Sequence, residues 1–414
     1  MARRRRIVLG LNSGTSADGI DAVACEIAGG GVDMKVRVLA HVHRKHNAPL
    51  RQRILNAMAP AASRTEAICK LDVEVGQAFA RTAAVVVREL GLTRVDLVGS
   101  HGQTICHIPP GGTLQNKPTR SRSRNTHGNV GTMQIGDPAI IATRLRAPVV
   151  SHFRQADMAV GGQGAPLTPW TDDVLFRHRH RHRIIQNIGG IANLTWLPAA
   201  GGAKRVIGFD TGPGNMIIDG LVRHFTRGRE RFDRGGRRAA RGTPHPVVLR
   251  HLLAHRYLAQ VPPKSCGRED FGETWVRRVL VSHARRRLSP DDWIATATAF
   301  TAASIAQAYA RYLPNRARKP VRIDEVLVCG GGAKNPTLLR ELADRVSREF
   351  IANSGDVVIR TTEDDGISPQ AKEAVSFAML AAACADGVPA NLPKVTGARR
   401  RVVLGQVCDP EPRR

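Results

Sequence analysis

The stretch IVLGLNSGTSADGIDAVACEI, at residues 7–27, decides the fold of the chain. Residues 7–12 form a short apolar run, and residues 20–27 alternate between apolar and polar side chains as a half-buried strand does. Residues 13–19 between them are small, hydroxylated or acidic, which is typical of a turn. The stretch therefore predicts a hairpin whose turn is rich in glycine, hydroxyl groups and carboxylates.

The same pattern returns in the second half of the chain. Residues 184–187 and 194–197 are predicted to be strands, joined by the glycine turn at residues 188–193. A third strand, at residues 206–209, runs into the sequence DTGPGN and then into a helix that begins near Met216. Each half of the chain therefore contains a glycine-turned hairpin.

The two halves also continue in a similar way. In the first half, a helix at residues 70–90 precedes a strand at 95–99, which we expect to end in the polar loop 100–104. In the second half, a strand at residues 325–329 ends in three glycines before a helix near 335–350. Two similar halves predict an α/β fold of two duplicated domains with a ligand cleft between them.

The boundary between these domains is expected at residues 165–183, where prolines and a run of alternating histidine and arginine interrupt the pattern. We therefore predict a first domain at residues 1–170 and a second at 171–414, whose C-terminal segment can pack back on the first. Residues 111–131 are polar, basic and poor in apolar side chains, so they are predicted to be a long surface loop.

The composition is that of a globular protein, since 42% of the 414 residues are hydrophobic and 23% are charged. No stretch reaches the roughly 20 apolar residues of a membrane helix, and the basic start lacks the apolar segment of a signal peptide. The seven cysteines are scattered singly, which is typical of a reducing compartment. We therefore expect a cytoplasmic protein with no membrane partner.

The net charge of +27 raises nucleic acid as a possible partner. However, the arginines are spread along the whole chain, and no basic motif is interleaved with aromatic residues. Charge of this kind attracts anions without a dedicated site. We therefore favour solvated basic surfaces and predict no specific nucleic-acid partner.

Four glycine-rich turns indicate a nucleotide site. The loop 13–19 allows a backbone to approach phosphate oxygens, and its N–H and hydroxyl groups can donate to them. On its own this loop is equally compatible with an ordinary Asp-Gly hairpin turn. Together with the turns at 189–190, 212–214 and 330–332, it suits ATP held by loops at its phosphates and by a glycine strip at its adenosine. Asp18 and Asp21 add carboxylates that could hold Mg²⁺.

Asp210 is the candidate catalytic residue. It follows an apolar strand and directly precedes a glycine turn and a helix start. A carboxylate in this place is fixed in direction and can accept a proton as a general base. The alternative is that Asp210 only caps the following turn.

A second set of polar residues lies in glycine-flanked segments of the first half and offers the donors and acceptors that a sugar needs. Each of them singly is more often structural, but as a set they are candidate substrate-binding residues: His101, Gln103, Asp137, Arg154 and Gln163.

Ten blocks of the sequence, in order between residues 7 and 405, resemble the signature blocks of the anhydro-N-acetylmuramic acid kinase family. They read GLNSGTSADGIDAV, GSHGQTICH, MQIGDPAIIA, FRQADMAVGGQGAPLTP, NIGGIANLT, GFDTGPGNMIIDG, PPKSCGRE, CGGGAKNPTLL, GISPQAKEAVSFA and NLPKVTGA. This resemblance implies an actin-like (ribonuclease H-like) fold of two domains, and a homodimer.

The resemblance also implies the activity. Members of the family open 1,6-anhydro-N-acetylmuramic acid with water and phosphorylate it with Mg-ATP to N-acetylmuramic acid 6-phosphate, in peptidoglycan recycling. Asp210 matches the general base, and Glu373 matches a glutamate of the sugar site. The candidate ATP-binding residues are Gly14, Thr15, Ser16, Ala17, Asp18, Gly19, Ile20, Asp21, Gly189, Gly190, Gly212, Gly214, Gly330, Gly331, Gly332 and Asn335.

Two alternatives stay open. One is a kinase for another amino sugar, because one fold serves many substrates. The other is a regulatory actin-like protein that binds ATP without catalysis, which would have no need for Asp210. Departures from the family pattern are mild: the loop 111–131 is longer and more basic than usual, and Asn12 and Ala17 replace larger apolar residues.

Overall fold

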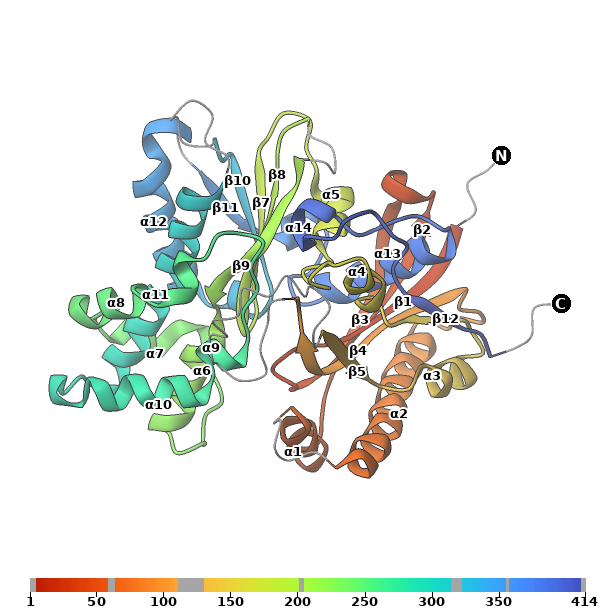
Figure 1. The fold of residues 1–414 in the computed structure, drawn as a ribbon, viewed down its shortest axis with the longest axis horizontal. Helices are drawn as coiled ribbons and strands as arrows, with labels where there is room; N and C mark the ends of the chain where they lie inside the picture. Colours follow the sequence, from red (N-terminus) through yellow and green to blue (C-terminus); the bar gives the residue numbers. More distant parts are fainter. Residues whose placement is uncertain are drawn as a thin grey trace. The chain divides into compact units, whose positions relative to one another are not determined.

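The structure is a computed structural model that describes residues 5–58, 64–110, 130–200, 205–313, 322–354 and 357–410. The chain forms two compact units (Figure 1). The first unit consists of Met1–Leu175 with Ala371–Arg414, and the second of Phe176–Gln370. The first crossing, where the chain passes from the first unit to the second after Leu175, lies inside the boundary region expected at residues 165–183. A second crossing, before Ala371, places the C-terminal segment in the first unit.

The first unit contains a seven-stranded mixed sheet in the order β12-β6-β4-β1-β2-β3, with β5 paired to β4. Strands β1, β2 and β3 are antiparallel neighbours, whereas β4 runs parallel to β1 and β6 runs parallel to β4. The bounds of the strands are β1 Arg5–Ser13, β2 Gly19–Ala28, β3 Lys35–Lys45, β4 Leu97–Ile108, β5 Gly131–Ile135, β6 Val149–Ser151 and β12 Gln406–Cys408.

The second unit contains a five-stranded sheet in the order β11-β10-β7-β8-β9. Here β7, β8 and β9 are antiparallel neighbours, and β10 and β11 run parallel to β7. Five strands of the first sheet follow the same order and directions, so the predicted class of duplicated α/β domains is confirmed. The bounds are β7 Arg183–Ile188, β8 Ile191–Leu197, β9 Ile207–Pro213, β10 Glu325–Cys329 and β11 Val358–Thr361.

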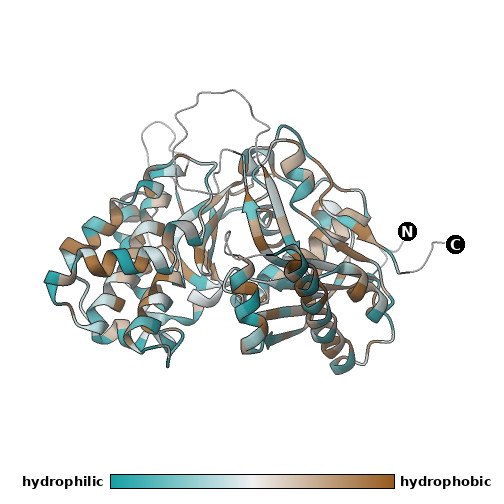
Figure 2. Cartoon of the chain, turned by 60° about the horizontal axis from the view of Figure 1, so that its bottom comes forward, coloured by the Kyte–Doolittle hydropathy of each residue, from teal (hydrophilic) through white to brown (hydrophobic). Residues whose placement is uncertain are grey.

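Helices cover both sheets. Those of the first unit are α1 Ala48–Ala57, α2 Thr65–Glu89, α3 Pro138–Leu145, α4 Gln155–Ala159, α5 Pro169–Phe176 at the first crossing, α13 Lys372–Ala385 and α14 Pro393–Thr396. Those of the second unit are α6 Asn215–Phe225, α7 Arg237–Arg241, α8 Pro246–Leu253, α9 Arg268–Phe271, α10 Glu273–Ser282, α11 Pro290–Tyr312 and α12 Pro336–Ser354. No described helix is long and apolar enough to cross a membrane, and hydrophobic and hydrophilic residues intermix along the helices (Figure 2).

The first sheet is packed on both faces. Leu9 and Leu11 on β1 belong to a core that includes Phe79 of α2. Because side chains alternate along a strand, Gly10 faces the other way, toward α13. A Cβ on Gly10 would lie 1.9 Å from the carbonyl oxygen of Ala374, and one on Gly99 2.1 Å from that of Phe377. Glycine at both positions therefore lets α13 lie directly on β1 and β4.

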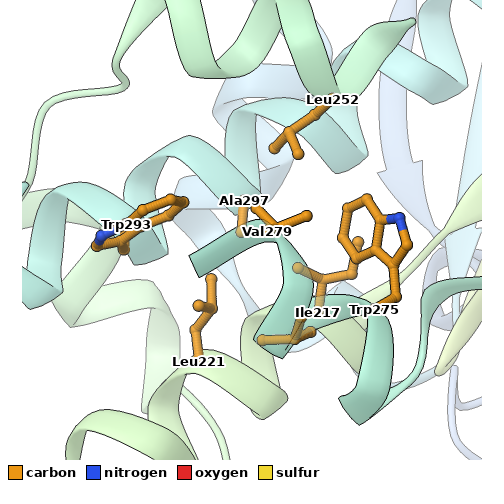
Figure 3. Close-up of a pocket in the computed structure, with 8 residues that line it drawn as sticks. Ile217, Leu221, Leu252, Trp275, Val279, Trp293 and Ala297 are labelled. Atoms are coloured by element: carbon orange, nitrogen blue, oxygen red, sulfur yellow. The ribbon is translucent and has the colours of Figure 1, made fainter. Parts of the chain in front are cut away.

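The second unit has two apolar cores. One packs β7–β10 against α11 and α12, and the other joins α6, α8, α10 and α11. The second core leaves a small apolar pocket between helices, in which Ile217, Trp275 and Trp293 converge (Figure 3). All of its lining residues are hydrophobic. The pocket thus lacks the polar groups that a sugar or a nucleotide needs.

Several predicted element ends are wrong. The polar segment 100–104 is not a loop, because β4 continues through it to Ile108 and pairs with β5. Likewise Asp210 lies within β9, which continues to Pro213. Neighbouring strands satisfy the backbone at 100–104, whereas the Lys264 carbonyl and the Tyr257 hydroxyl bond to the backbone of Asp210. Polar side chains therefore sit on extended chain in both places. The predicted basic loop at 111–131 falls almost entirely outside the described residues.

Candidate active site

The turn between β1 and β2 forms a compact loop. The Ala17 N–H donates to the Gly14 carbonyl at 3.0 Å, and the Ser16 hydroxyl donates to Asp18 Oδ1 at 2.8 Å. A Cβ placed on Gly14 would meet no atom within 4 Å, so the loop is open on that side. Thr15 and Asp18 are exposed, whereas Ala17 is buried beneath them. The loop therefore offers hydroxyl groups and a carboxylate to an incoming ligand.

Asp21 has a different environment from Asp18. Its Oδ1 atom accepts hydrogen bonds from His41 Nε2 at 2.8 Å and from His43 Nδ1 at 3.0 Å, both on β3. Burial alone would raise the pKa of Asp21, but these hydrogen bonds and the nearby imidazoles lower it overall. The carboxylate of Asp21 is thus ionised and committed to two histidines that the sequence analysis did not single out.

Gln103 is joined to the same loop. The Ser13 hydroxyl donates to Gln103 Oε1 at 2.6 Å, and Gln103 Nε2 donates to the Gly14 carbonyl at 3.3 Å. Gln103 is fully buried, and His46 Nε2 lies 3.4 Å from the Ser13 hydroxyl. Gln103 therefore supports the loop that was predicted to bind phosphate.

His101, which is buried, and Arg154, which is half-buried, form a hydrogen-bonded pair. Arg154 donates from its Nη2 atom to His101 Nε2 at 2.9 Å and from its Nη1 atom to the Gly164 carbonyl at 2.6 Å. Burial and the Arg154 charge hold the pKa of His101 well below its usual value. The imidazole is therefore neutral, accepting at Nε2 and donating from Nδ1 to the Gly102 carbonyl at 3.1 Å.

Glu373 lies at the start of α13 and accepts a hydrogen bond from Asn12 Nδ2 at 2.8 Å. Phe377, one turn further along α13, packs against His101 with a ring-centroid distance of 4.5 Å and the two rings tilted by 32°. Residues four apart share one face of a helix. The structure therefore brings Asn12, His101, Arg154 and Glu373 to the same part of the first unit.

In the second unit, Asp210 is fixed from several directions. Its Oδ2 atom accepts from the Cys266 N–H at 3.0 Å, and its own N–H donates to the Lys264 carbonyl at 3.3 Å. The Tyr257 hydroxyl donates to the Asp210 carbonyl at 2.7 Å. Asp210 is half-buried, and its carboxylate is held in a fixed direction. This is the arrangement that a general base needs.

Two of the glycine turns lie against each other beside Asp210. The N–H groups of Gly214 and Asn215 donate to the carbonyls of Gly190 and Gly189 at 3.0 and 2.8 Å. Gly212 has a φ of 139°, which favours glycine. The segment after Asp210 therefore turns onto the β7–β8 hairpin as α6 begins.

The third glycine turn joins this cluster. A Cβ on Gly330 would lie 2.4 Å from Asn187 Oδ1, and one on Gly332 would lie 2.5 Å from the Ile188 side chain. Gly331 lies near the amide of Asn215, while Asn335 accepts from the Leu338 N–H at 3.0 Å and caps α12. The turns 189–190, 212–214 and 330–332, far apart in sequence, thus pack together as one cluster.

Comparison with known proteins decides the family. The family model described as "AnmK: Anhydro-N-acetylmuramic acid kinase" matches residues 6–410. The anhydro-N-acetylmuramic acid kinase of Salinibacter ruber is 43% identical, covering 99% of this chain and 98% of that protein. The one of Caldanaerobacter subterraneus is 38% identical, covering 98% and 97%. The chain belongs to the anhydro-N-acetylmuramic acid kinase family.

Solved structures give more distant likenesses to this family member. An activator of the 2-hydroxyisocaproyl-CoA dehydratase from Clostridium difficile, with bound ADPNP, aligns with 92% of this chain and 96% of that chain at 12% identity and a TM-score of 0.43. A ROK family glucokinase from Streptomyces griseus, in complex with glucose and AMPPNP, aligns with 91% and 99% at 13% identity and a TM-score of 0.40.

Two residues that were predicted to bind the sugar, Asp137 and Gln163, form hydrogen bonds within the protein. Asp137 accepts from the Ala139 N–H at 2.8 Å and so caps α3. The Gln163 N–H donates to the Thr396 carbonyl at 2.7 Å, which ties the glycine-rich loop after α4 to α14. Their role toward the sugar stays a prediction.

Sequence reasoning missed Lys264 in the PPKSCGRE block. Its side chain is 5% exposed, and its Nζ atom lies 4.4 Å from the ring centroid of Tyr312 and 4.8 Å from that of Tyr257. A lysine directly after two prolines could have been flagged as an unusual place for a charge. Its aromatic surroundings were invisible in the sequence, because they come from distant segments.

Proposed function

We propose that this chain converts 1,6-anhydro-N-acetylmuramic acid, ATP and water into N-acetylmuramic acid 6-phosphate and ADP, in the recycling of peptidoglycan. The observation that carries this proposal is the family match over residues 6–410. The fixed carboxylate of Asp210 beside the glycine turns supports it, because a regulatory ATP-binding protein has no need of such a base.

Asp210 is assigned as the base of the ring-opening step. Its carboxylate takes a proton from water, the water oxygen attacks the anomeric carbon C1, and the C1–O6 bond breaks. O6 then takes the γ-phosphoryl group of ATP, and ADP leaves. The protein mainly positions groups and neutralises charge in phosphoryl transfer, so a directed carboxylate and bound phosphates are sufficient.

The ATP contacts are assigned to the loop 14–19 of the first unit and to the glycine turns of the second. The residues fit Mg²⁺ at Asp18 better than at Asp21, because Asp18 is exposed beside a hydroxyl group while Asp21 is held by His41 and His43. Mg²⁺ bound beside Asp18 would neutralise part of the charge of the ATP phosphates. The described residues contain no cluster of three or more ligands that would form a protein-only metal site.

The sugar contacts are assigned to the cluster of Asn12, His101, Arg154 and Glu373. The Asn12 amide and the Glu373 carboxylate suit hydroxyl and amide groups, and the Arg154 cation, which neutral His101 holds in place, suits the lactyl carboxylate of a muramic acid. None of the seven cysteines, all within the described residues, forms a disulfide, which supports a cytoplasmic location. The homodimer stays a prediction.

Replacing Glu373 with alanine is expected to raise KM for the sugar about 10- to 100-fold, because a charged hydrogen-bonding group is worth about 1.5–3 kcal/mol. KM for ATP should change less than twofold. Steady-state kinetics with each substrate varied in turn measure both values, and Glu89→Ala, an exposed glutamate at the end of α2, is the control. An equal loss of affinity for both substrates would show that Glu373 is only structural.

A coupled assay of ADP release tests the activity itself. The substrates are 1,6-anhydro-N-acetylmuramic acid, N-acetylmuramic acid and N-acetylglucosamine, and the product is analysed for a 6-phosphate. We expect turnover with the anhydro sugar alone. Turnover with an open sugar alone would show that the substrate is another amino sugar. ATP binding without any turnover would favour a regulatory protein.

A further inference from the structure

Lys264 is a buried cation that the mechanism above does not use. Its Nζ atom lies over three rings, at 4.4, 4.8 and 5.7 Å from the centroids of Tyr312, Tyr257 and Phe209. The side chain is 5% exposed, and Nζ is 3.5 Å from the Tyr257 carbonyl. Cation–π attraction offsets part of the cost of removing an ammonium group from water. The three rings thus form an aromatic cage that holds the positive charge of Lys264 inside the second unit.

The same residues that hold Lys264 also hold Asp210. The Lys264 carbonyl accepts from the Asp210 N–H at 3.3 Å, and two residues later the Cys266 N–H donates to Asp210 Oδ2 at 3.0 Å. Tyr257 contacts both residues, since its ring lies under the ammonium group and its hydroxyl donates to the Asp210 carbonyl. Phe209, the third ring of the cage, precedes Asp210 on β9. A change at Lys264 is therefore transmitted to Asp210 through the backbone of residues 264–266.

Lys264 also interacts electrostatically with Asp210. Burial lowers the pKa of Lys264 to about 8, while the neighbouring Cys266 and Asp210 raise it and Arg311 lowers it. Burial likewise raises the pKa of Tyr257, so its hydroxyl stays protonated. At neutral pH the lysine is therefore mostly an ammonium ion, and Asp210 is the carboxylate it interacts with.

We propose that Lys264 is a positioning residue that holds Asp210 in the orientation and the ionised state needed to activate water. Lys264 supplies a positive charge near Asp210. Its side chain also anchors the segment 264–266 inside the aromatic cage. Such a charge favours a carboxylate over a carboxylic acid at Asp210. This proposal rests on the proposed role of Asp210 as the general base.

If Lys264 served only to stabilise the fold, replacing it would lower the stability of the protein. Folding lowers the pKa of Lys264 below that of an exposed lysine, so the ammonium form destabilises the folded state at pH values below about 8. This destabilisation disappears as pH rises above the pKa of the unfolded chain. An apolar side chain of similar length should therefore stabilise the fold at neutral pH. Loss of activity without loss of stability would identify a functional role.

Lys264→Met is the principal test. We expect kcat to fall roughly 10- to 100-fold, KM values for sugar and ATP to stay within twofold, and Tm at pH 7 not to fall. The acidic limb of the pH profile of kcat should move to higher pH, because the cation that favours ionised Asp210 is gone. Lys35→Met, at an exposed position on β3, is the matched control and should behave as the unmodified enzyme.

Lys264→Arg provides a second measurement that does not depend on the folding of the methionine variant. Arginine keeps its charge at high pH, so a fall in kcat above pH 8 in the unmodified enzyme should be absent in this variant. An unchanged acidic limb in folded Lys264→Met, or the same alkaline fall in Lys264→Arg, would overturn the inference. If Asp210→Asn itself retains turnover, the assignment of Asp210 as the base fails instead, so the two failures are distinguishable.

Discussion

Replacing Asp210 with asparagine is expected to lower kcat by about 10²–10⁴-fold, the usual contribution of a general base. Asparagine has nearly the same shape and keeps an oxygen that can accept the Cys266 N–H bond, which is 3.0 Å long in the structure. The Tyr257 hydroxyl bonds to the backbone carbonyl of Asp210, so the substitution leaves that contact in place. The variant therefore removes the proton acceptor and its negative charge beside Lys264 while these two hydrogen bonds remain.

ATP binding is expected to survive in Asp210→Asn. Titration calorimetry with a non-hydrolysable ATP analogue should give a Kd within threefold of that of the unmodified enzyme. Asp344→Asn, at an exposed position on α12, is the control for a charge change in the same unit. Near-normal turnover in Asp210→Asn would remove Asp210 from the role of base and leave the glycine turns without an assigned catalytic partner.

The parts of the fold that could be predicted from sequence are those specified by neighbouring residues. The alternation at residues 20–27 and the glycine turn at 188–193 are local patterns, and both hairpins are present. The return of α13 to the first sheet is not local. After Glu373 its sequence is apolar except for Ser376, which indicates burial but not the sheet against which it is buried. Gly10 and Gly99 supply that information only once the sheet is known.

The residues of the candidate site also differ in whether the local sequence could predict them. Asp210 and the glycine turns could be found because each directly follows a short apolar run in the sequence. The cage of Lys264 could not, because Phe209, Tyr257 and Tyr312 meet only through the packing of β9 and α11 with the segment between α8 and α9. Gln103 was predicted on the sugar side, yet it is bonded to Ser13 and Gly14, since the continuation of β4 carries it next to β1.

The largest expected effect on stability concerns a buried ion pair in the first unit. Lys372 Nζ lies 2.5 Å from Asp172 Oδ1, and their side chains are 1% and 2% exposed. The Thr171 hydroxyl donates to the Ser376 hydroxyl at 2.8 Å beside them. Asp172 lies three residues before the first crossing of the chain, and Lys372 directly follows Ala371 at the second. The pair thus ties α5 to α13 where both crossings occur.

Lys372→Met is expected to lower the free energy of unfolding by about 3–5 kcal/mol, because it leaves the Asp172 carboxylate buried without its cation. Chemical denaturation measures this change, and Lys70→Met, which removes an exposed ion pair with Glu66, is the control with a small expected change. The double variant Asp172→Leu with Lys372→Met should recover most of the loss, since two apolar groups need no partner. If the double variant is no more stable than Lys372→Met alone, charge burial is not the cause.

The same pair has a consequence for the proposed sugar site. Glu373 is the next residue after Lys372, and its contact with Asn12 depends on the position of the first turn of α13. Lys372→Met should therefore raise KM for the sugar while KM for ATP stays nearly constant, and the double variant should reverse part of this rise. A variant that loses stability but keeps its sugar KM would show that the remaining packing of α13 on β1 is enough to hold Glu373 in place.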